Sequence, residues 1–365
     1  MSKKSCLIVG SGLTGSTAAW KLAESGWKVT IEEAELLVGG HVRTAEFGGL
    51  LYEQNGIHVF HTENEKAMQH ISRFTELIPY EHRVLTEILL GTFSWPIQLE
   101  ELEKLPNWKT IEREITTLPS NPIDTNFETY AISLMGKTLY QMFVEPYTRK
   151  QWGEDPKNLS ASFAPKRIDF RRDGNKKLFK DKYQGWPRGG WTNLIEKMLL
   201  ENPIEIILGR CVTEDSITWS DFDAVIVTAP LDQFLNEEQL PWRGVKVEHH
   251  FFPKARRFNL QAGQVNHPGM DEKYTRRTET KWMSGQSETH LGTFVTYEFP
   301  VSNLRHYPID DKNGENKKRA NSLKQQLKFK HSNAIVAGRL ANYVYINTDQ
   351  AIIQGLNAAN RALRM

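Results

Sequence analysis

The sequence predicts an α/β fold, with a discontinuous Rossmann-like domain, a helical insertion domain and an antiparallel β-sheet domain. Three observations support this class. A strand, a glycine-rich turn, a helix and a second strand follow one another in residues 6–33. Apolar strand-like runs return later in the chain, and residues 245–300 alternate as antiparallel strands do. We expect the Rossmann-like domain at 1–77, 187–244 and 305–365, the helical domain at 78–160, and the sheet domain at 161–186 and 245–304.

The first turn carries the glycine pattern of a dinucleotide site. Gly10, Gly12 and Gly15 stand between the apolar run 6–9 and a helical pattern. Such glycines allow a tight turn, the approach of a pyrophosphate to the backbone and close packing of helix on strand. Glu33 follows 18 residues beyond Gly15, where a carboxylate accepts hydrogen bonds from ribose hydroxyls. A tight turn without any ligand is the alternative.

Paired glycines after the acidic residue favour a flavin over a nicotinamide cofactor. Gly39 and Gly40 follow Glu33 closely. This arrangement resembles FAD proteins of the glutathione-reductase and amine-oxidase types, in which paired glycines pass close to the cofactor.

Composition gives no sign of a nucleic-acid-binding, membrane or metal protein. The formal net charge is +2, and charged residues of mixed sign make up 25% of the chain. Two cysteines supply neither a metal framework nor a disulfide scaffold. We find no signal-peptide pattern and no apolar run of membrane-spanning length, and therefore expect a cytoplasmic protein.

Two histidines follow the cofactor pattern in a glycine-led loop. His58 and His61 flank Phe60, and either a structural role or a contact to cofactor or substrate is open for them. Thr62 and Glu65 have the spacing of a capping box, which predicts a helix through about Leu77. The last helix is expected from about residue 350 to 363, capped by Asp349.

Residues 78–160 are expected to be mostly helical. Apolar residues recur at helical spacing in 97–105 and 129–147, between prolines. Tyr147 and Trp152 close this region, either as a stacking platform for a planar ring or as ordinary packing at a helix end.

A basic segment with interleaved aromatic rings follows at 166–188. Lysines and arginines outnumber acids there. Such segments are usually solvated surface, but this one also suits an anionic ligand that carries a ring. Because the rest of the chain is not basic, a nucleotide-like small molecule is favoured over nucleic acid. We expect the Lys- and Gly-containing part, 172–180, to act as a lid over the site.

Taken in order, the motifs resemble the UDP-galactopyranose mutase family from end to end. They are Ile8-Val-Gly-Ser-Gly, Glu33 with Gly39-Gly40, Gly56-Ile-His-Val-Phe-His-Thr62, Tyr147-Thr-x-Lys-Gln-Trp-Gly153, Lys166-Arg-Ile-x-x-Arg171, Asp181-x-Tyr-Gln-Gly-x-Pro187, Gly189-Gly190, Tyr274-Thr-Arg276, Val295-Thr-x-Glu298, Tyr307-Pro308 and Gly338-Arg-Leu-Ala-x-Tyr343.

This resemblance implies roles for individual residues. Those implied as catalytic, beside the flavin, are Arg171, Arg276 and His61. Those implied to bind substrate are Tyr147, Trp152, Tyr183, Asn266, Glu298, Tyr307, Tyr343 and Asn347. Those implied to contact FAD are Gly10, Gly12, Leu13, Thr14, Gly15, Glu33, Gly40, His41, His58, His61, Arg243, Gly338 and Arg339.

The resemblance also implies the chemistry. The family interconverts the pyranose and furanose forms of a nucleotide sugar, with UDP-galactose as the default substrate. Reduced FAD supplies N5 as the nucleophile toward the anomeric carbon, and NAD(P)H or another reductant is needed to prime it. The implied product, a galactofuranose donor, serves cell-surface polysaccharide synthesis. A homodimer is one option for the assembly, and neither nucleic acid nor membrane is expected as a partner.

Departures from the family pattern leave the sugar open. The family usually has Tyr and Asp where this chain has Ile346 and Asn347. An amide in place of a hydroxyl-binding carboxylate changes both charge and donors, so an N-acetylated, deoxy or pentose sugar nucleotide is the first alternative. An FAD oxidase or desaturase of the amine-oxidase type and a nucleic-acid binder are the others.

Overall fold

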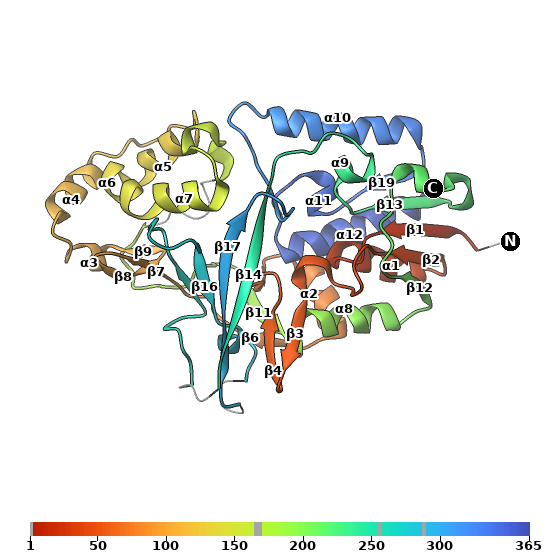
Figure 1. Cartoon of the computed structure of the whole chain (residues 1–365), viewed down its shortest axis with the longest axis horizontal. Helices are drawn as coiled ribbons and strands as arrows, with labels where there is room; N and C mark the ends of the chain where they lie inside the picture. The colour runs from red at the N-terminus through yellow and green to blue at the C-terminus, as the bar shows by residue number, and fades with distance from the viewer. Residues whose placement is uncertain (1–2, 164–169, 254–256, 287–289) are drawn as a thin grey trace.

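The computed structural model describes residues 3–163, 170–253, 257–286 and 290–365, and it has the expected α/β architecture. Figure 1 shows a helical lobe on the left, a parallel sheet covered by helices on the right, and a mixed sheet between them. Lys166 and Arg167 of the predicted basic segment lie outside the described residues.

A five-stranded parallel sheet forms the Rossmann-like part. Its strand order is β12 (Ile204–Ile207), β2 (Lys28–Glu32), β1 (Ser5–Val9), β13 (Ala224–Val227) and β19 (Ala334–Val336). All five strands match apolar runs expected from the sequence. The sheet therefore draws on distant parts of the chain, and the exact domain boundaries stay a prediction.

Both faces of this sheet are buried, which explains why its strands are almost continuously apolar. Ile8, Ile226 and Ile335 point to one face, where they belong to the same core as helices α1 (Leu13–Glu24), α2 (Glu65–Phe74), α8 (Gly190–Leu200) and α12 (Thr348–Ala362). Leu7 and Val225 point to the other face, in a second core with α9 (Leu231–Phe234) and α10 (Glu315–Lys330).

A seven-stranded sheet, antiparallel except at one pair, lies beside the Rossmann-like part. Its order is β18 (Tyr307–Pro308), β14 (Trp242–Phe252), β17 (Thr293–Val301), β16 (Arg276–Thr278), β15 (Gln264–Asn266), β7 (Val84–Ile88) and β8 (Gly91–Trp95). β15 and β7 run parallel. Smaller sheets are formed by β5 (Phe60–Thr62), β11 (Tyr183–Pro187) and β6 (Leu77–Pro79), by β3 (Thr44–Phe47) and β4 (Leu50–Glu53), and by β9 (Ile97–Gln98) and β10 (Phe170–Arg171).

The helical expectation for 78–160 is wrong in its first part. Residues 84–95 form a hairpin whose exposed tip is Leu89 and Leu90, and strand β7 gains β15 as its second neighbour. β-branched and aromatic residues favour such strands. Helices begin only at Leu99: α3 (Leu99–Leu102), α4 (Trp108–Thr116), α5 (Phe127–Met135), α6 (Lys137–Leu139), a π-helical turn (Tyr140–Val144) and α7 (Glu145–Trp152).

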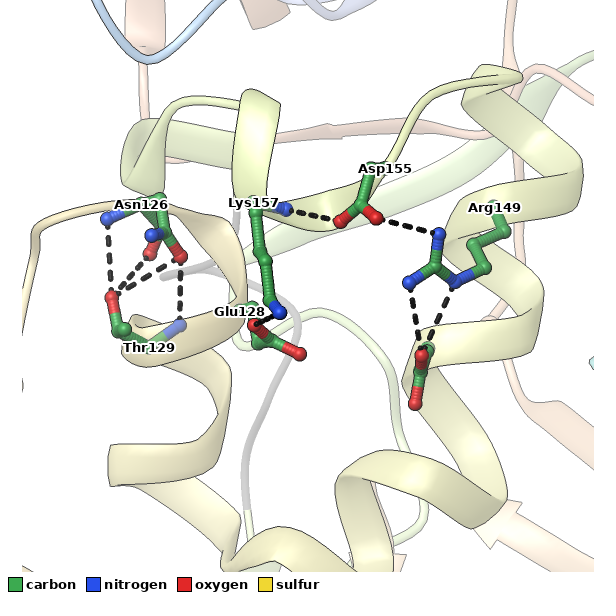
Figure 2. A network of polar contacts seen from close by, with 7 residues as sticks. Asn126, Glu128, Thr129, Arg149, Asp155 and Lys157 are labelled. Atoms are coloured by element: carbon green, nitrogen blue, oxygen red, sulfur yellow. Dashed lines mark hydrogen bonds and ion pairs between the residues drawn. The ribbon is translucent and has the colours of Figure 1, made fainter.

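A polar network holds α7 in the helical lobe (Figure 2). Arg149 contacts Glu145 within the helix and donates to Asp155 Oδ2 over 3.0 Å. Asp155 also accepts from the backbone N–H of Lys157, whose ammonium lies 3.7 Å from Glu128 on α5. These contacts fix the helix that carries Tyr147 and Trp152.

Two predicted helix starts need correction. Asn64, not Thr62, caps α2, because its side chain accepts from two backbone N–H groups of the first turn. Asn347, not Asp349, precedes α12, and the Gln350 side chain accepts from its N–H. Thr62 instead donates to Asp349 over 2.8 Å, which ties β5 to α12.

Candidate active site

Three predicted site residues stand in one row across the seven-stranded sheet. The register places Asn266 on β15 opposite Arg276 on β16, and Arg276 opposite Glu298 on β17. Directly opposed residues share a face of the sheet. Arg276 Nε donates to Glu298 Oε2 over 2.6 Å, and both side chains are largely buried. Burial opposes the charge on Arg276, but the Glu298 carboxylate outweighs it and holds the pKa of the guanidinium above its usual value.

The glycine-led loop packs directly on this ion pair. A Cβ at Gly56 would lie 3.0 Å from Glu298 Oε2, and Gly56 has φ +92°. Glu298 Oε1 has no hydrogen-bond partner among the described residues. The loop therefore brings His58 to the row, where Arg276 and Arg339 are among the charges that act on its ring.

Arg339 lies beside two tyrosine rings at the start of α11 (Arg339–Asn342). Its guanidinium carbon is 5.3 Å from the centroids of both Tyr307 and Tyr345, which stack on each other at 5.5 Å. It also donates to the carbonyl of Ile346 over 2.5 Å. Tyr345 was not among the predicted site residues; its position two residues after Tyr343 in a Tyr-x-Tyr pattern was the available signal.

The helical lobe contributes aromatic rings to the same region. Trp152 meets Tyr307 edge to face at 6.1 Å, and Tyr147 is among the groups whose charge acts on Arg276. Arg243 holds the end of α7 in place, since its Nε and Nη2 donate to the main-chain carbonyls of Gln151 and Lys150. The structure thus gives Arg243 a role in positioning α7, and its predicted cofactor contact stays a prediction.

Two histidines stack beside the glycine cradle, the turn formed by Gly10, Gly12, Gly15 and Gly40. His41 and His306 lie 4.2 Å apart with nearly parallel rings. Burial lowers the pKa of His306 to about 4 and holds that of His41 well below its usual value. His306 Nε2 has no hydrogen-bond partner among the described residues. His306 follows Arg305 in the sequence without any motif, so nothing in the sequence alone marked it.

The first turn fits a dinucleotide. Gly10 has φ +99°, a Cβ on Gly15 would lie 2.0 Å from the Gly10 carbonyl, and a Cβ on Gly40 would lie 3.1 Å from Gly12 Cα. At Gly12, by contrast, a Cβ would meet nothing within 4 Å, and no side chain caps the N-terminus of α1. Uncapped N–H groups at a helix start favour a phosphate.

The acidic residue of the cradle is fixed in place. Glu33 is buried and accepts from both the N–H and the hydroxyl of Ser11 over 2.7 Å, and from Glu35 N–H over 2.9 Å. Gly338 has φ +88° and lies against Thr14, so the start of α11 closes the same cradle. Open space at Gly12, uncapped N–H groups at the start of α1 and a fixed carboxylate together fit FAD.

Other predicted residues have different partners in this structure. Tyr343 is buried, and its hydroxyl donates to Pro241 O over 2.5 Å and accepts from Ile309 N–H. Its predicted substrate contact stays a prediction. Tyr183 donates to the Glu65 carboxylate at the surface, and its predicted substrate contact likewise stays a prediction.

Arg171 and His61 are held by their own loop. Arg171 Nη1 donates to the carbonyls of Asn175 and Lys177 and lines an open cavity of about 450 Å³. His61 stacks on Phe179 at 3.6 Å, and its Nδ1 lies 2.9 Å from Asp181 Oδ2. Their catalytic roles stay predictions, as does the motion of 172–180.

Within the described ranges, no three histidine, cysteine or acidic side chains are grouped as a metal site. Nor does any helix in those ranges have the length and apolar character needed to cross a membrane.

Comparisons with known proteins agree with this geometry. The model of the UDP-galactopyranose mutase family matches residues 142–345, and an NAD(P)-binding Rossmann-like model matches 8–74. A Klebsiella pneumoniae protein named "Probable UDP-galactopyranose mutase" is 30% identical over 100% of this chain and 96% of its own length. An Escherichia coli dTDP-fucopyranose mutase is 29% identical over 97% of both chains.

Solved structures share the fold. A crystal structure of reduced UDP-galactopyranose mutase has a TM-score of 0.80 at 17% identity and covers 99% of this chain and 96% of its own. A putrescine oxidase structure has a TM-score of 0.63 at 14% identity over the full length of both. From the family model, the full-length relatives and the assembled site, we conclude that this chain is an isomerase that belongs to the UDP-galactopyranose mutase family.

Proposed function

We propose that this enzyme interconverts the pyranose and furanose forms of a nucleotide sugar, with UDP-galactose as the default substrate and reduced FAD as the cofactor. The observation that carries the proposal is the Asn266–Arg276–Glu298 row, in which Glu298 is buried against Gly56 of the glycine-led loop. Family membership supplies the reaction class.

The cradle would hold FAD through backbone rather than side chains. The N–H groups of Leu13, Thr14 and Gly15 face the open space at Gly12, and Glu33 is placed to accept from the ribose. When bound in reduced form, the flavin supplies a nucleophilic N5 for the anomeric carbon, and NAD(P)H or another reductant is needed only to prime it.

The side chains of the site would bind and orient the nucleotide sugar. Arg276 and Arg339 offer forked N–H donors for diphosphate oxygens, and Tyr307 and Tyr345 lie beside Arg339. Trp152, next to Tyr307, fits a role in stacking the base. Buried arginines also stabilise the UDP leaving group, because charge interactions are stronger where water is excluded.

Incubation of chemically reduced enzyme with UDP-galactofuranose tests the proposal. We expect conversion to UDP-galactopyranose, measured by chromatography, with little turnover by the oxidised enzyme. Arg276→Lys serves as the matched variant, because it keeps the charge but loses the Nε donor to Glu298. Stoichiometric oxygen consumption without sugar conversion would instead support an oxidase of the amine-oxidase type.

A dTDP-linked 6-deoxy sugar is the second candidate substrate. Two observations favour it: the E. coli dTDP-fucopyranose mutase is about as similar as the K. pneumoniae protein, and Ile346 and Asn347 replace the usual Tyr and Asp. A panel of UDP- and dTDP-linked sugars offered to the same reduced enzyme separates the two. Turnover of dTDP-fucose with none of UDP-galactose would overturn the default.

A further inference from the structure

Glu53 is a buried carboxyl group in the site whose second oxygen faces only a histidine. It ends strand β4 and is 1% exposed. Oε1 accepts from Trp186 Nε1 over 2.7 Å and lies 3.5 Å from the Thr44 hydroxyl. Oε2 has no hydrogen-bond partner among the described residues and lies 3.4 Å from His58 Nδ1, which has none either. Two unpartnered polar atoms thus face each other in a buried place.

The surrounding charges disfavour an ionised Glu53. The Glu298 carboxylate adds negative charge nearby, although Arg276 donates to it over 2.6 Å. Burial, reinforced by Glu298, raises the pKa of Glu53 well above its usual range. The remaining charged or titratable groups that act on His58 are Arg339, Arg276, His306 and His41, and the backbone of Gly56 favours its protonated form through a hydrogen bond.

The histidine is disfavoured as a cation for the same reason. Burial, with Arg339 and Arg276, lowers the pKa of His58 to about 3. Both directions favour the uncharged pair, a carboxylic acid beside a neutral imidazole. Because Oε1 already accepts from an indole N–H, the Glu53 proton belongs on Oε2, where Nδ1 can accept it.

We propose that Glu53 is a positioning residue that stores one proton for the sugar and passes it through the His58 ring. This rests on the proposed pyranose–furanose reaction. As the sugar ring opens, the C1–O5 bond breaks and O5 gains a proton from His58 Nε2, while His58 Nδ1 takes the proton of Glu53. As the other ring closes, O4 bonds to C1 and its proton returns to His58, which restores Glu53. No net proton is gained or lost.

Glu53→Gln removes the transferable proton while keeping the size of the side chain and its hydrogen bonds. The amide keeps the volume, accepts from Trp186 and donates to His58 Nδ1, but it has no proton to transfer. We expect kcat to fall about a hundredfold, a loss typical of proton transfer in catalysis, with KM and flavin content unchanged. Glu46→Gln, on the exposed partner strand β3, is the matched control and should equal wild type. An unchanged kcat in Glu53→Gln would overturn the proposal.

Infrared spectroscopy tests the stored proton without turnover. At pH 7 we expect a carboxylic-acid carbonyl band in the wild-type holoenzyme that is absent from Glu53→Gln and present in Glu46→Gln. Equal spectra would overturn the proposal, because Glu53 would then be ionised. A wild-type enzyme that converts no nucleotide sugar contradicts the proposed function, whereas the band still reports the state of Glu53. Should Glu53→Gln not fold, His58→Gln breaks the same path, and full activity in that variant would overturn the relay.

Discussion

Replacement of Tyr343 by Phe tests whether this tyrosine belongs to the fold or to the substrate. Its hydroxyl donates to Pro241 O over 2.5 Å and accepts from Ile309 N–H over 3.2 Å, and its ring meets Trp242 edge to face. The ring contact survives in Phe. Ile309 N–H keeps a second acceptor, because Pro241 O lies 3.3 Å from it. The loss is therefore that of one net hydrogen bond with no orphaned donor, and we expect the free energy of unfolding to fall by about 1 kcal/mol.

Urea unfolding followed by tryptophan fluorescence measures this change. Tyr345→Phe is the matched control, since Tyr345 is 38% exposed and keeps its stack on Tyr307 as Phe. We expect the control to unfold within about 0.5 kcal/mol of wild type, as surface substitutions usually do. Steady-state kinetics complete the test. Unchanged stability of Tyr343→Phe together with a raised KM for the nucleotide sugar would refute the structural role and restore the substrate role expected from the sequence.

Other predictions concern the cradle, the ion pair and the response to acid. Gly12→Ala should leave the apoprotein as stable as wild type but abolish flavin absorbance after purification, because the new Cβ enters open space that a pyrophosphate needs. Gly15→Ala should also destabilise the apoprotein, because its Cβ would lie 2.0 Å from the Gly10 carbonyl oxygen. Arg276→Lys should lower kcat/KM at least about tenfold in the sugar assay, because the Nε donor to buried Glu298 is lost. The urea concentration at the unfolding midpoint should fall as the pH drops from about 6.5 to 4, because histidines that are neutral in the folded protein take up protons on unfolding. Each such histidine lowers the free energy of unfolding by up to about 1.4 kcal/mol per pH unit. A midpoint that does not change with pH would contradict this. The histidines concerned are His58, whose pKa burial lowers to about 3, and four others whose pKa burial lowers to about 4: His70, His82, His267 and His306.

Local patterns in the sequence were enough for the Rossmann-like part. The glycines of the first turn, the apolar strands and the acidic residue at the end of β2 each have a cause within a few residues of themselves. Glu33 could be found in this way, and the structure places it against Ser11 in the same turn. The hairpin at 84–95 was missed although β7 and β8 carry β-branched and aromatic residues, whereas its second neighbour β15 lies far away in the chain and leaves no local signal.

A site residue could be predicted where a sequence motif contains it. It could not be predicted where only the pairing register of the strands brings it into the site. β15 and β16 are three residues long, so no periodicity fixes which of their side chains face Glu298. A motif also marked Tyr343, but its hydroxyl donates to Pro241 O in this structure, and Tyr345, which no motif marked, lies beside Arg339. Glu53 and His306 carried no signal, since their importance comes from burial beside other charges.

Ile346 and Asn347, the two departures from the family pattern near the end of the chain, have no backbone role that requires these residue types. Asn347 stands at the start of α12, where Asn and Asp serve equally well as the residue before a helix. The fold therefore gives no reason to prefer the amide. Ile346 is buried, and its carbonyl, which any residue would supply, accepts from Arg339. Since the backbone needs neither change, the structure leaves both positions available for our proposal that they select between galactose and a 6-deoxy sugar, which the panel of UDP- and dTDP-linked sugars tests.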